Sequence, residues 1–372
     1  MRVVMLSKAM VALAYQAKAT AIARLGVDLT VVVPPFWRDG TVIQRLERTT
    51  GEGFRLVVWP VRLAGHFHLH WYPGLGRLLA AVRPDLLHID EEPYNLATVL
   101  ALQAGLAVGA TCLFFTWQNI FKRYPPPFGW FERRVLSRAA GAIAGNRAAA
   151  GVLARKGFRG PVVVVPQFGV DLTLFRPRPP RRPGEPFVIG YIGRLVPQKG
   201  VSDLLQAVLG LRGDWRLVFL GEGQERAALA RRAATAGVSE RVTFLPWVPS
   251  RAVADHLRRF DVLVLPSRST PRWQEQFGRV LVEAMACGVP VVGSSSGEIP
   301  HVIGEAGLVY PEGDCAALRA CLERLWADHD LWQACAQRGL ERASAFAHER
   351  IAEQTVAFYR QLRESSCPAP RE

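Results

Sequence analysis

Cysteine is scarce in this 372-residue chain and shows no metal-binding spacing. The six cysteines include no Cys-x-x-Cys pair and fit no zinc pattern, which argues against a zinc site and against a disulfide framework. We therefore expect small buried or incidental thiols in a reducing cytosol. With 49% hydrophobic and 21% charged residues, the chain is predicted to be globular and long enough for two separate cores.

Lysine is also scarce: five lysines stand against 41 arginines, and the formal net charge is +14. This skew can follow from codon usage as well as from function. What remains is a preference for anionic partners, namely diphosphate donors and anionic lipid headgroups. Nucleic acid comes last, because no RNA- or DNA-binding motif accompanies the charge.

No stretch has the composition of a membrane signal. Lys8 interrupts the apolar start Met1–Leu6 too early for a signal-peptide core. Residues 94–121 carry no charge and are long enough to span a bilayer, but they include four amide side chains and two glycines. A buried helix near 93–104 followed by a strand at 111–116 explains them better, and we expect a cytoplasmic protein.

Short β-branched runs alternate with helical patterns along both halves of the chain. This alternation predicts α/β units with parallel sheets, joined by the stiff, Pro-rich and basic stretch 178–186. We expect a first domain over 1–177, a second domain over 187–344, and a closing helix with a tail over 345–372. The expected strands are 2–7, 27–34, 55–63, 85–90, 111–116, 140–145, 162–166, 187–192, 217–220, 242–246, 261–265, 289–292 and 308–310.

The stretch from Ser267 to Pro300 is the most informative. Glu275 is predicted in a loop after a buried strand, and Glu283 in the helix that follows, which ends at Gly288. Ligands of open α/β sheets bind at the carboxyl ends of strands, where this loop lies, and a helix N-terminus there favours phosphate. Carboxylates beside such a site can accept hydrogen bonds from sugar hydroxyls. The alternative is that both are solvated charges on a surface helix.

Glu275-x7-Glu283, with Phe277-Gly278 after the first Glu and Glu-Ala-Met-Ala-x-Gly-x-Pro-Val-Val at the second, resembles family 4 of the retaining GT-B glycosyltransferases. The resemblance implies an α/β fold of two Rossmann-like domains facing across a cleft, with the C-terminal helix crossing back to the first domain. It also implies that Glu275 contacts the transferred sugar and that Glu283 contacts the nucleotide ribose.

Gly193-Arg194 and Lys199-Gly200 resemble the motif with which this family holds the donor diphosphate. A glycine turn after a strand, followed by two cations on long side chains, agrees with that role, each charge-assisted bond being worth roughly 1.5–3 kcal/mol. The alternative is a loop with two solvated cations. The further donor-side residues expected from the resemblance are Gly221, Gly223, Phe277, Gly278, Arg279, Val280 and Gly297.

The first half departs from the family pattern at two places. The usual Gly-Gly loop after the first strand is replaced by a stretch that begins with Lys8, and Gln118 stands where many relatives carry a His that contacts the donor sugar. Gln118 can exchange hydrogen bonds but cannot titrate near neutrality. The acidic cluster 90–92 can touch substrate or cap the following helix. The expected acceptor-side residues are Lys8, Tyr15, Glu91, Trp117 and Asn119.

Residues 121–134 mix aromatic and cationic side chains around three prolines. Such a segment can lie on a membrane surface, or it can pack its aromatics inward with Arg133 and Arg134 in water. Both interpretations stay open.

Neither a metal nor a cofactor is expected. His66, His68 and His70 would share one face of an extended segment, but no local cysteine or carboxylate completes a site. Asp328-His329-Asp330 matches the metal-binding Asp-x-Asp of another glycosyltransferase fold, but between two helices it is predicted to be a capping turn.

The resemblance therefore implies a hexosyltransferase. It would transfer a sugar from a nucleotide diphosphate-sugar to a glycan, lipid-linked or small-molecule acceptor, with retention of configuration and without metal. This hypothesis is compatible with a role in cell-envelope polysaccharide synthesis and with peripheral contact with the anionic inner membrane face. The alternatives are an epimerase or phosphorylase of the same fold, and a basic membrane- or nucleic-acid-binding protein with an inactive core.

Overall fold

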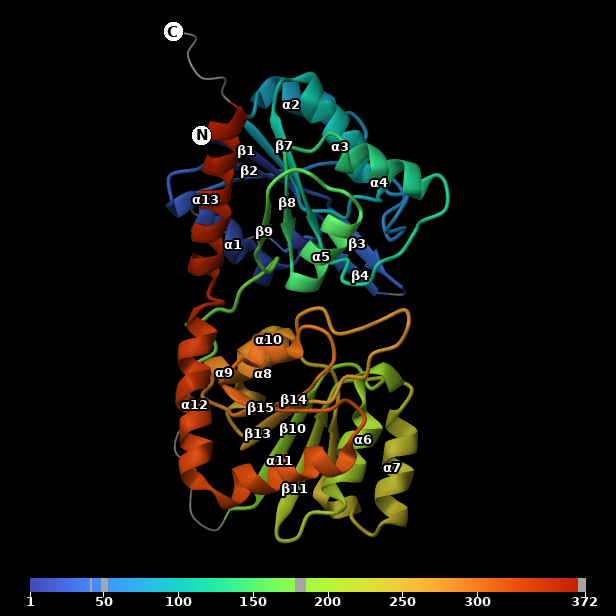
Figure 1. The fold of residues 1–372 in the computed structure, drawn as a ribbon, viewed down its shortest axis with the longest axis vertical. Helices are drawn as coiled ribbons and strands as arrows, with labels where there is room; N and C mark the ends of the chain where they lie inside the picture. The colour runs from blue at the N-terminus through green and yellow to red at the C-terminus, as the bar shows by residue number, and fades with distance from the viewer. Residues whose placement is uncertain (41, 48–52, 178–184, 367–372) are drawn as a thin grey trace. The chain divides into compact units, whose positions relative to one another are not determined.

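The computed structural model describes residues 1–40, 42–47, 53–177 and 185–366, and the chain divides into two compact units (Figure 1). The first unit consists of residues 1–169 and 348–372, and the second of residues 170–347. Each unit has its own parallel sheet, as the alternation of strands and helices predicts.

The sheet of the first unit is parallel, in the order β5-β2-β1-β6-β7-β8-β9. Its inner strands read as continuous apolar runs because helices cover both faces. The strands are β1 (Arg2–Leu6), β2 (Asp28–Val33), β5 (Arg55–Val58), β6 (Leu86–Ile89), β7 (Thr111–Thr116), β8 (Gly141–Ala144) and β9 (Val162–Val164). The helices are η1 (Ala9–Val11), α1 (Leu13–Arg24), α2 (Leu75–Val82), α3 (Leu96–Ala107), α4 (Phe128–Leu136), α5 (Arg147–Arg155) and α13 (His348–Ser366).

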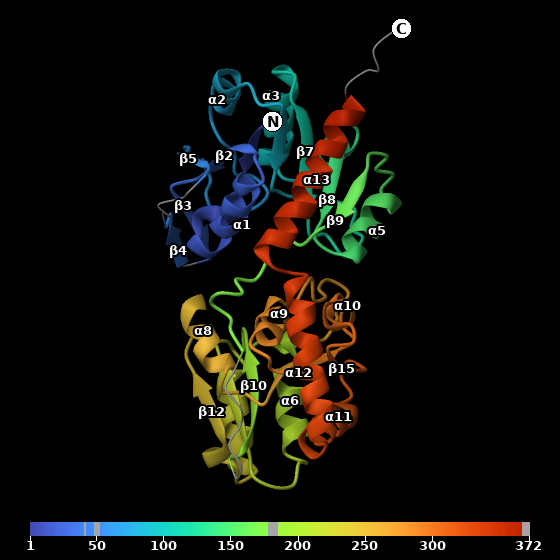
Figure 2. The same cartoon turned by 90° about the vertical axis from the view of Figure 1, so that its left-hand side faces the viewer.

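The two faces of this sheet have separate cores. One core joins the sheet to α1 and α13, which lie side by side in Figures 1 and 2. Ile351, Tyr359 and Leu362 of α13 are fully buried in it. The other core joins the sheet to α2, α3 and α4. The expected return of the closing helix to the first domain is therefore confirmed.

The sheet of the second unit is also parallel, in the order β12-β11-β10-β13-β14-β15. Its strands are β10 (Phe187–Ile192), β11 (Trp215–Leu220), β12 (Val242–Leu245), β13 (Val262–Leu265), β14 (Val291–Ser294) and β15 (Gly307–Tyr310). Its helices are η2 (Pro197–Lys199), α6 (Val201–Val208), α7 (Arg226–Thr235), η3 (Ser239–Arg241), α8 (Ser250–Leu257), α9 (Arg279–Ala286), α10 (Ile299–Ile303), α11 (Cys315–Ala327) and α12 (His329–Ser344).

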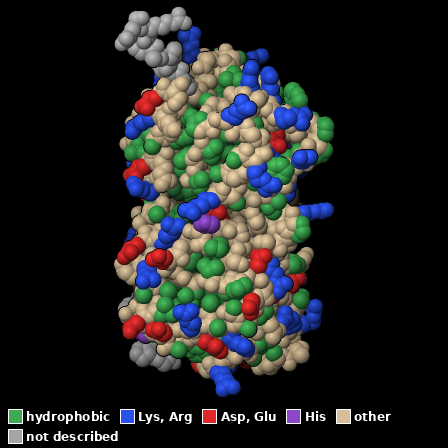
Figure 3. Space-filling view, viewed as in Figure 1, with side chains coloured by type: hydrophobic (Ala, Val, Ile, Leu, Met, Phe, Trp, Pro, Cys, Tyr) green, Lys and Arg blue, Asp and Glu red, His purple; other side chains and the backbone are tan. Residues whose placement is uncertain are grey.

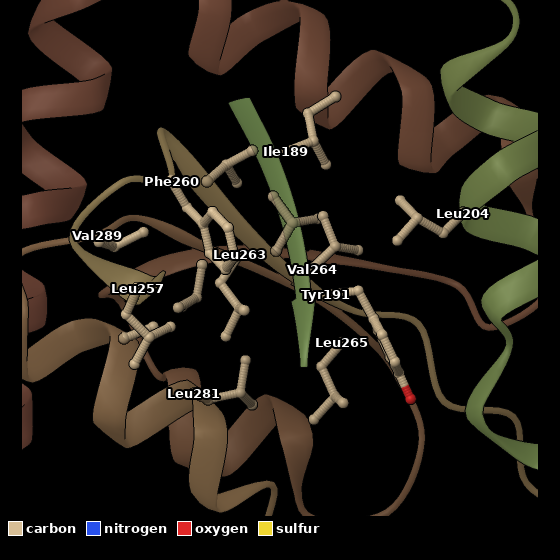
Figure 4. Packing of buried hydrophobic residues seen from close by; sticks show 14 of the residues in the cluster. Ile189, Tyr191, Leu204, Leu257, Phe260, Leu263, Val264, Leu265, Leu281 and Val289 are labelled. Carbon is tan, nitrogen blue, oxygen red and sulfur yellow. The ribbon is translucent and has the colours of Figure 1, made fainter. Parts of the chain in front are cut away.

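The core of the second unit surrounds β10 and β13. Figure 4 shows Ile189 and Tyr191 of β10 among Leu263, Val264 and Leu265, all of them buried. The Tyr191 ring belongs to this core, whereas its hydroxyl reaches the loop after β10 and donates to the Arg194 carbonyl oxygen at 2.8 Å. The apolar packing of the sheet thus holds the loop that carries the first predicted donor cation.

The chain passes between the units earlier than predicted. Val170 and Phe175 are buried in the core of the second unit, and the Val170 N–H donates to the Phe346 carbonyl oxygen at 2.9 Å. The second unit therefore begins before the expected linker 178–186, of which residues 178–184 lie outside the described residues. Burial of Val170 and Phe175 in the second core places the boundary before the Pro-rich stretch whose composition suggested it.

Three local expectations need correction. The strand expected over 55–63 ends at Val58, because Pro60 has no N–H to donate to a neighbouring strand. The strand expected over 289–292 pairs from Val291 instead, again after a proline. The antiparallel pair β3 (Phe36–Asp39) and β4 (Val42–Arg45) was not predicted, although Asp39-Gly40 is a hairpin-turn signal.

The uncharged stretch 94–121 folds as α3 followed by β7, which agrees with the helix and strand expected there. Within the described part of the chain, no helix combines the length and the apolar character that crossing a bilayer requires. Asp328 caps α12 by accepting a hydrogen bond from the Leu331 N–H at 2.9 Å, as predicted for a capping turn.

Tyr359→Phe tests the attachment of α13 to the first sheet. Tyr359 shares a hydrogen bond of 2.6 Å with Nδ1 of buried His88, and removing the hydroxyl leaves that nitrogen buried without it. We expect the free energy of unfolding to fall by about 1–3 kcal/mol in denaturant titrations. Arg360→Gln, at the neighbouring exposed position, is the control. Equal stability of the two variants would contradict this attachment.

Candidate active site

The predicted donor residues follow three parallel strands of the second unit. Lys199 lies in η2 after β10, Glu275 lies in the loop after β13, and Gly297 lies in the turn after β14. Parallel strands end at the same edge of their sheet, and β13 pairs with both β10 and β14. The topology therefore brings together residues that are far apart in the sequence.

Lys199 and Glu275 form an ion pair. The Lys199 Nζ lies 2.6 Å from Glu275 Oε2, which also accepts a hydrogen bond of 2.8 Å from the Ser267 hydroxyl. The side chains are only 16% and 9% exposed, so solvent screens the pair weakly. The Trp273 ring lies 5.0 Å from the same Nζ. A buried carboxylate is thus neutralised by the cation that was predicted to bind diphosphate.

The main chain of Glu275 is held by the turn that contains Gly297. A Cβ atom at Gly297 would lie 2.0 Å from the Glu275 carbonyl oxygen, and its φ of +55° also favours glycine. That carbonyl oxygen accepts a hydrogen bond of 3.1 Å from the Glu298 N–H. The turn therefore positions Glu275. Because α10 is only five residues long, its helix dipole contributes little to binding a phosphate.

Glu283 lies on α9, as predicted, and has a different partner. Its Oε1 lies 3.0 Å from Arg279 Nε, one helical turn away. Burial raises the pKa of Glu283, although Arg279 opposes this shift. Gly278 precedes α9 with a φ of +77°, so the first turn of the helix begins at Arg279. Phe277 packs edge-on against Phe346 at 5.5 Å, and Val280 is half-buried.

The loops after β10 and β11 lie in direct main-chain contact. A Cβ atom at Gly221 would lie 2.1 Å from the Gly193 carbonyl oxygen, and one at Gly223 would lie 2.1 Å from the Leu195 carbonyl oxygen. These glycines are therefore required for the two loops to touch. The Arg194 side chain, which lies between Gly193 and Leu195 in the first of these loops, is exposed, while its carbonyl oxygen accepts a hydrogen bond from the Tyr191 hydroxyl.

The first unit contains a second buried ion pair, between Lys8 and Glu91. The Trp37 and Phe67 rings lie 5.4 and 5.8 Å from the Lys8 Nζ, and His70 Nε2 lies 3.4 Å from Glu91 Oε1. Although burial alone raises the pKa of Glu91, its interactions with Lys8 and His70 lower that pKa to about 2. Lys8 thus neutralises a carboxylate at the loop where the family pattern has glycines.

Glu92 supports the predicted acceptor-side residue Trp117. Its carboxylate accepts hydrogen bonds from the Thr116 hydroxyl at 2.6 Å and from the Trp117 N–H at 2.8 Å, while burial raises the pKa of Glu92 to about 7. The Trp117 indole N–H donates to Gln167 Oε1 at 2.8 Å. The alternative that the acidic cluster caps α3 is wrong, because the N-cap is Asn95.

Tyr15 and Asn119 lie at other points of the first unit. The Tyr15 ring stacks on Phe168 at 4.0 Å. Asn119 follows Gln118 in the loop after β7.

Gln118 is held by a cation. Its Oε1 accepts a hydrogen bond of 2.9 Å from the Lys156 Nζ, and the same Nζ pairs with the buried carboxylate of Glu132. Its Nε2 donates to the Ile120 carbonyl oxygen at 3.3 Å. Gln118 is therefore fixed in place by its neighbours.

Two of the three histidines of residues 66–70 have separate side-chain partners. His68 Nδ1 lies 3.1 Å from Asn95 Oδ1, whereas His70 Nδ1 lies 3.0 Å from the Phe67 carbonyl oxygen. In the described ranges, no group of three His, Cys, Asp or Glu side chains is arranged to hold a metal ion.

Sequence reasoning missed Ser267, Trp273 and Lys156. Ser267 ends the β13 run and Trp273 lies in the same loop as Glu275, so position after a buried strand was a usable signal for both. Lys156 follows α5, and nothing in its local sequence indicates contact with Gln118.

Comparison with family models identifies the chain. Residues 11–167 match the glycosyl transferase 4-like domain, and residues 175–342 match the glycosyl transferases group 1 model. The chain belongs to the group 1 glycosyltransferases. These two matches correspond to the two parallel-sheet units, and they confirm the resemblance found in the Glu275–Glu283 region.

Curated relatives of this group 1 glycosyltransferase include two actinobacterial proteins. The D-inositol 3-phosphate glycosyltransferase of Segniliparus rotundus is 31% identical over 56% of this chain and 48% of its own length. The GDP-mannose-dependent alpha-(1-6)-phosphatidylinositol monomannoside mannosyltransferase of Mycolicibacterium smegmatis is 34% identical over 43% and 46%. The match thus spans about half the length of these relatives.

A solved structure shows that the fold is GT-B. HepE of Anabaena, crystallised with UDP, superposes with a TM-score of 0.74 over 97% of this chain and 100% of the other, at 18% identity. The expected α/β fold of two Rossmann-like domains is thereby confirmed.

Glu92→Gln tests the environment of the Glu92 carboxyl group. A folded-state pKa raised from 4.5 to about 7 means that the folded protein holds this proton more tightly than the unfolded chain does. The stability due to Glu92 is therefore complete below about pH 4.5 and is lost as the pH rises to about 7. We expect wild-type stability, relative to Glu92→Gln, to fall by roughly 1–3 kcal/mol across that range.

This difference is measured by urea titrations at several pH values, with the exposed substitution Glu240→Gln as the control. A wild-type-minus-variant difference that stays constant from pH 4.5 to 7 would show that the Glu92 pKa is not raised.

Proposed function

We propose that this group 1 glycosyltransferase transfers a hexose from a nucleotide diphosphate-sugar to an acceptor, with retention of anomeric configuration. The observation that carries the proposal is the buried pair of Lys199 and Glu275 at the carboxyl end of β10 and β13. It places a cation suited to phosphate beside a carboxylate suited to sugar hydroxyls. Family membership supports the same reaction.

In this proposal, Arg194 and Lys199 bind the diphosphate of the donor. Exposed Arg194 is free to turn toward a phosphate, and Lys199 lies within the site. Negative charge grows on the diphosphate as the glycosidic bond breaks, so cations that contact it stabilise the transition state more than the ground state. The N-terminus of α9 adds the positive end of a helix dipole. We therefore propose metal-independent transfer, with no cofactor.

The ion pair explains how a carboxylate can lie next to an anionic donor. An uncompensated Glu275 would repel the diphosphate, and burial would strengthen that repulsion. Lys199 cancels this charge and, once the donor is bound, can be shared between the carboxylate and a phosphate oxygen. Glu275 would then orient the hydroxyls of the transferred sugar, while Glu283 would contact the ribose.

We assign the acceptor side to the first unit. Lys8 and Glu91 present a compensated ion pair beside aromatic rings, a combination suited to a hydroxylated ring. Trp117, Asn119 and Gln118 lie together in the loop after β7, and Gln118 is proposed to contact the donor sugar. Tyr15 completes the predicted set.

The donor base, the acceptor and the location are also proposals. HepE was crystallised with UDP, while the M. smegmatis relative is named for GDP-mannose and a phosphatidylinositol acceptor. We propose a glycan or lipid-linked acceptor of the cell envelope, in the cytoplasm, with peripheral contact to the anionic inner membrane face. The formal net charge of +14 supports this contact.

Glu275→Ala tests the proposed function. Removing the carboxylate frees Lys199 for phosphate, so we expect the protein to bind nucleotide diphosphate at least as tightly as the wild type does. Turnover should fall at least about a hundredfold, because the hydroxyl contacts that orient the sugar are lost. Thermal shifts with UDP, GDP, ADP and their sugars identify the donor and measure binding, and product analysis with a glycan acceptor measures turnover.

Glu240→Ala, at an exposed site of η3, is the matched control and should behave as wild type. Wild-type turnover in Glu275→Ala would remove the role of Glu275. A wild-type protein that responds to none of the nucleotides would refute the transferase proposal, and product formed without acceptor would indicate an epimerase.

A further inference from the structure

The outer face of α3 is apolar although it meets solvent. The helix contains no charged residue, and its exposed positions Leu100, Gln103, Leu106 and Ala107 share one side. Leu100 and Leu106 remain 39% and 38% exposed. A helix that is apolar on all sides is typical of a buried or membrane-contacting environment. This face therefore needs an explanation.

α4 lies beside α3, and α4 together with the residues directly after it adds an exposed tryptophan and exposed arginines. Trp130 is 51% exposed, Arg134 lies one helical turn after it, and exposed Arg138 follows the end of α4. The inward side of α4 carries Phe131 and Val135 in the core. Both interpretations of residues 121–134 therefore apply in part: some aromatic side chains pack into the core, and Trp130 stays exposed beside the cations.

The two helices enclose a surface groove of about 310 Å³. Residues of α3 line one part of it, and Arg134 of α4 and Arg138 after α4 line the other. The lining residues are Leu102, Gln103, Leu106, Ala107, Arg134 and Arg138.

The exposed charged residues between residues 93 and 138 are all cationic. Between residues 93 and 138 the only acidic residue is Glu132, which is buried and paired with Lys156. Exposed Lys122, Arg123 and Arg133 accompany the two groove arginines. In Figure 3, Lys and Arg side chains are interspersed with hydrophobic ones over the region where Figure 1 shows α3 and α4.

We propose that the α3–α4 face, defined by Leu100, Leu106, Trp130, Arg134 and Arg138, docks on an anionic phospholipid surface. The two guanidinium groups bind a headgroup phosphate at the groove, while the leucines and the tryptophan enter the interfacial layer. This docking rests on the proposed function in one respect: a lipid-linked acceptor would be located at a membrane.

Charge decides between a membrane and a second copy of the chain. A symmetric dimer through this face would bring the arginines of one copy against those of the other, with no exposed carboxylate on α3 or α4 to compensate them. An anionic bilayer supplies both the negative charge and an apolar layer. The α3–α4 face is therefore better suited to an anionic bilayer than to a symmetric dimer of this chain.

Co-sedimentation of the full chain with vesicles tests this docking, without donor or acceptor present. Wild type should bind vesicles of phosphatidylcholine with phosphatidylglycerol, and bind phosphatidylcholine alone only weakly. Arg134→Gln/Arg138→Gln should weaken binding by about thirtyfold, since each cation near the surface contributes. Arg231→Gln/Arg251→Gln, which removes two exposed arginines of the second unit, should change it less than about twofold.

Leu100→Gln/Leu106→Gln should weaken binding at high salt as well as at low salt, because the loss is apolar. Equal losses in the Arg134/Arg138 and Arg231/Arg251 variants would show non-specific attraction and overturn the proposal. The proposal would also be overturned if light scattering showed that the wild type is a dimer and that Leu100→Gln/Leu106→Gln is a monomer. Nucleotide thermal shifts of the same variants should remain those of wild type, so failure of docking is distinguishable from failure of the transferase proposal.

Discussion

The ion pair between Lys199 and Glu275 is the interaction on which the proposed chemistry depends. The Lys199 Nζ and Glu275 Oε2 are 2.6 Å apart, and both side chains are largely buried, so each charge offsets the cost of burying the other. The strands β10, β13 and β14 end at one sheet edge and deliver the loops that hold the pair. Even the glycine turn after β14 contacts the Glu275 main chain directly. The second unit is thus organised around one compensated carboxylate.

The first unit repeats this principle with different residues. Lys8 compensates Glu91, and Lys156 compensates Glu132 while also holding Gln118. Three of the five lysines in the chain therefore neutralise buried carboxylates in ion pairs. Lysine carries a compact charge on a flexible stem, which suits a pair that must later be shared with a ligand. The abundant arginines include several at exposed positions, such as Arg134 and Arg138 of the α3–α4 face.

Much of this arrangement was predictable, for identifiable reasons. The β-branched runs and the Glu275–Glu283 spacing located the strands, the loop and α9, because buried parallel strands leave a local apolar signal. The pairing of Lys199 with Glu275 was not predictable, since it joins loops after different strands. Burial of Lys18, whose pKa is lowered chiefly by that burial, has no local signal either. The hairpin at Asp39-Gly40 had a signal that was overlooked.

A double-mutant cycle on Lys199 and Glu275, with nucleotide diphosphate affinity measured by titration calorimetry, tests the central claim most directly. If Lys199 both neutralises Glu275 and binds phosphate, Lys199→Met should weaken binding at least about tenfold, since it leaves a buried anion facing the ligand. Adding Glu275→Gln should then restore a substantial part of the affinity. Wild-type affinity in Lys199→Met, or strictly additive effects of the two substitutions, would contradict the account.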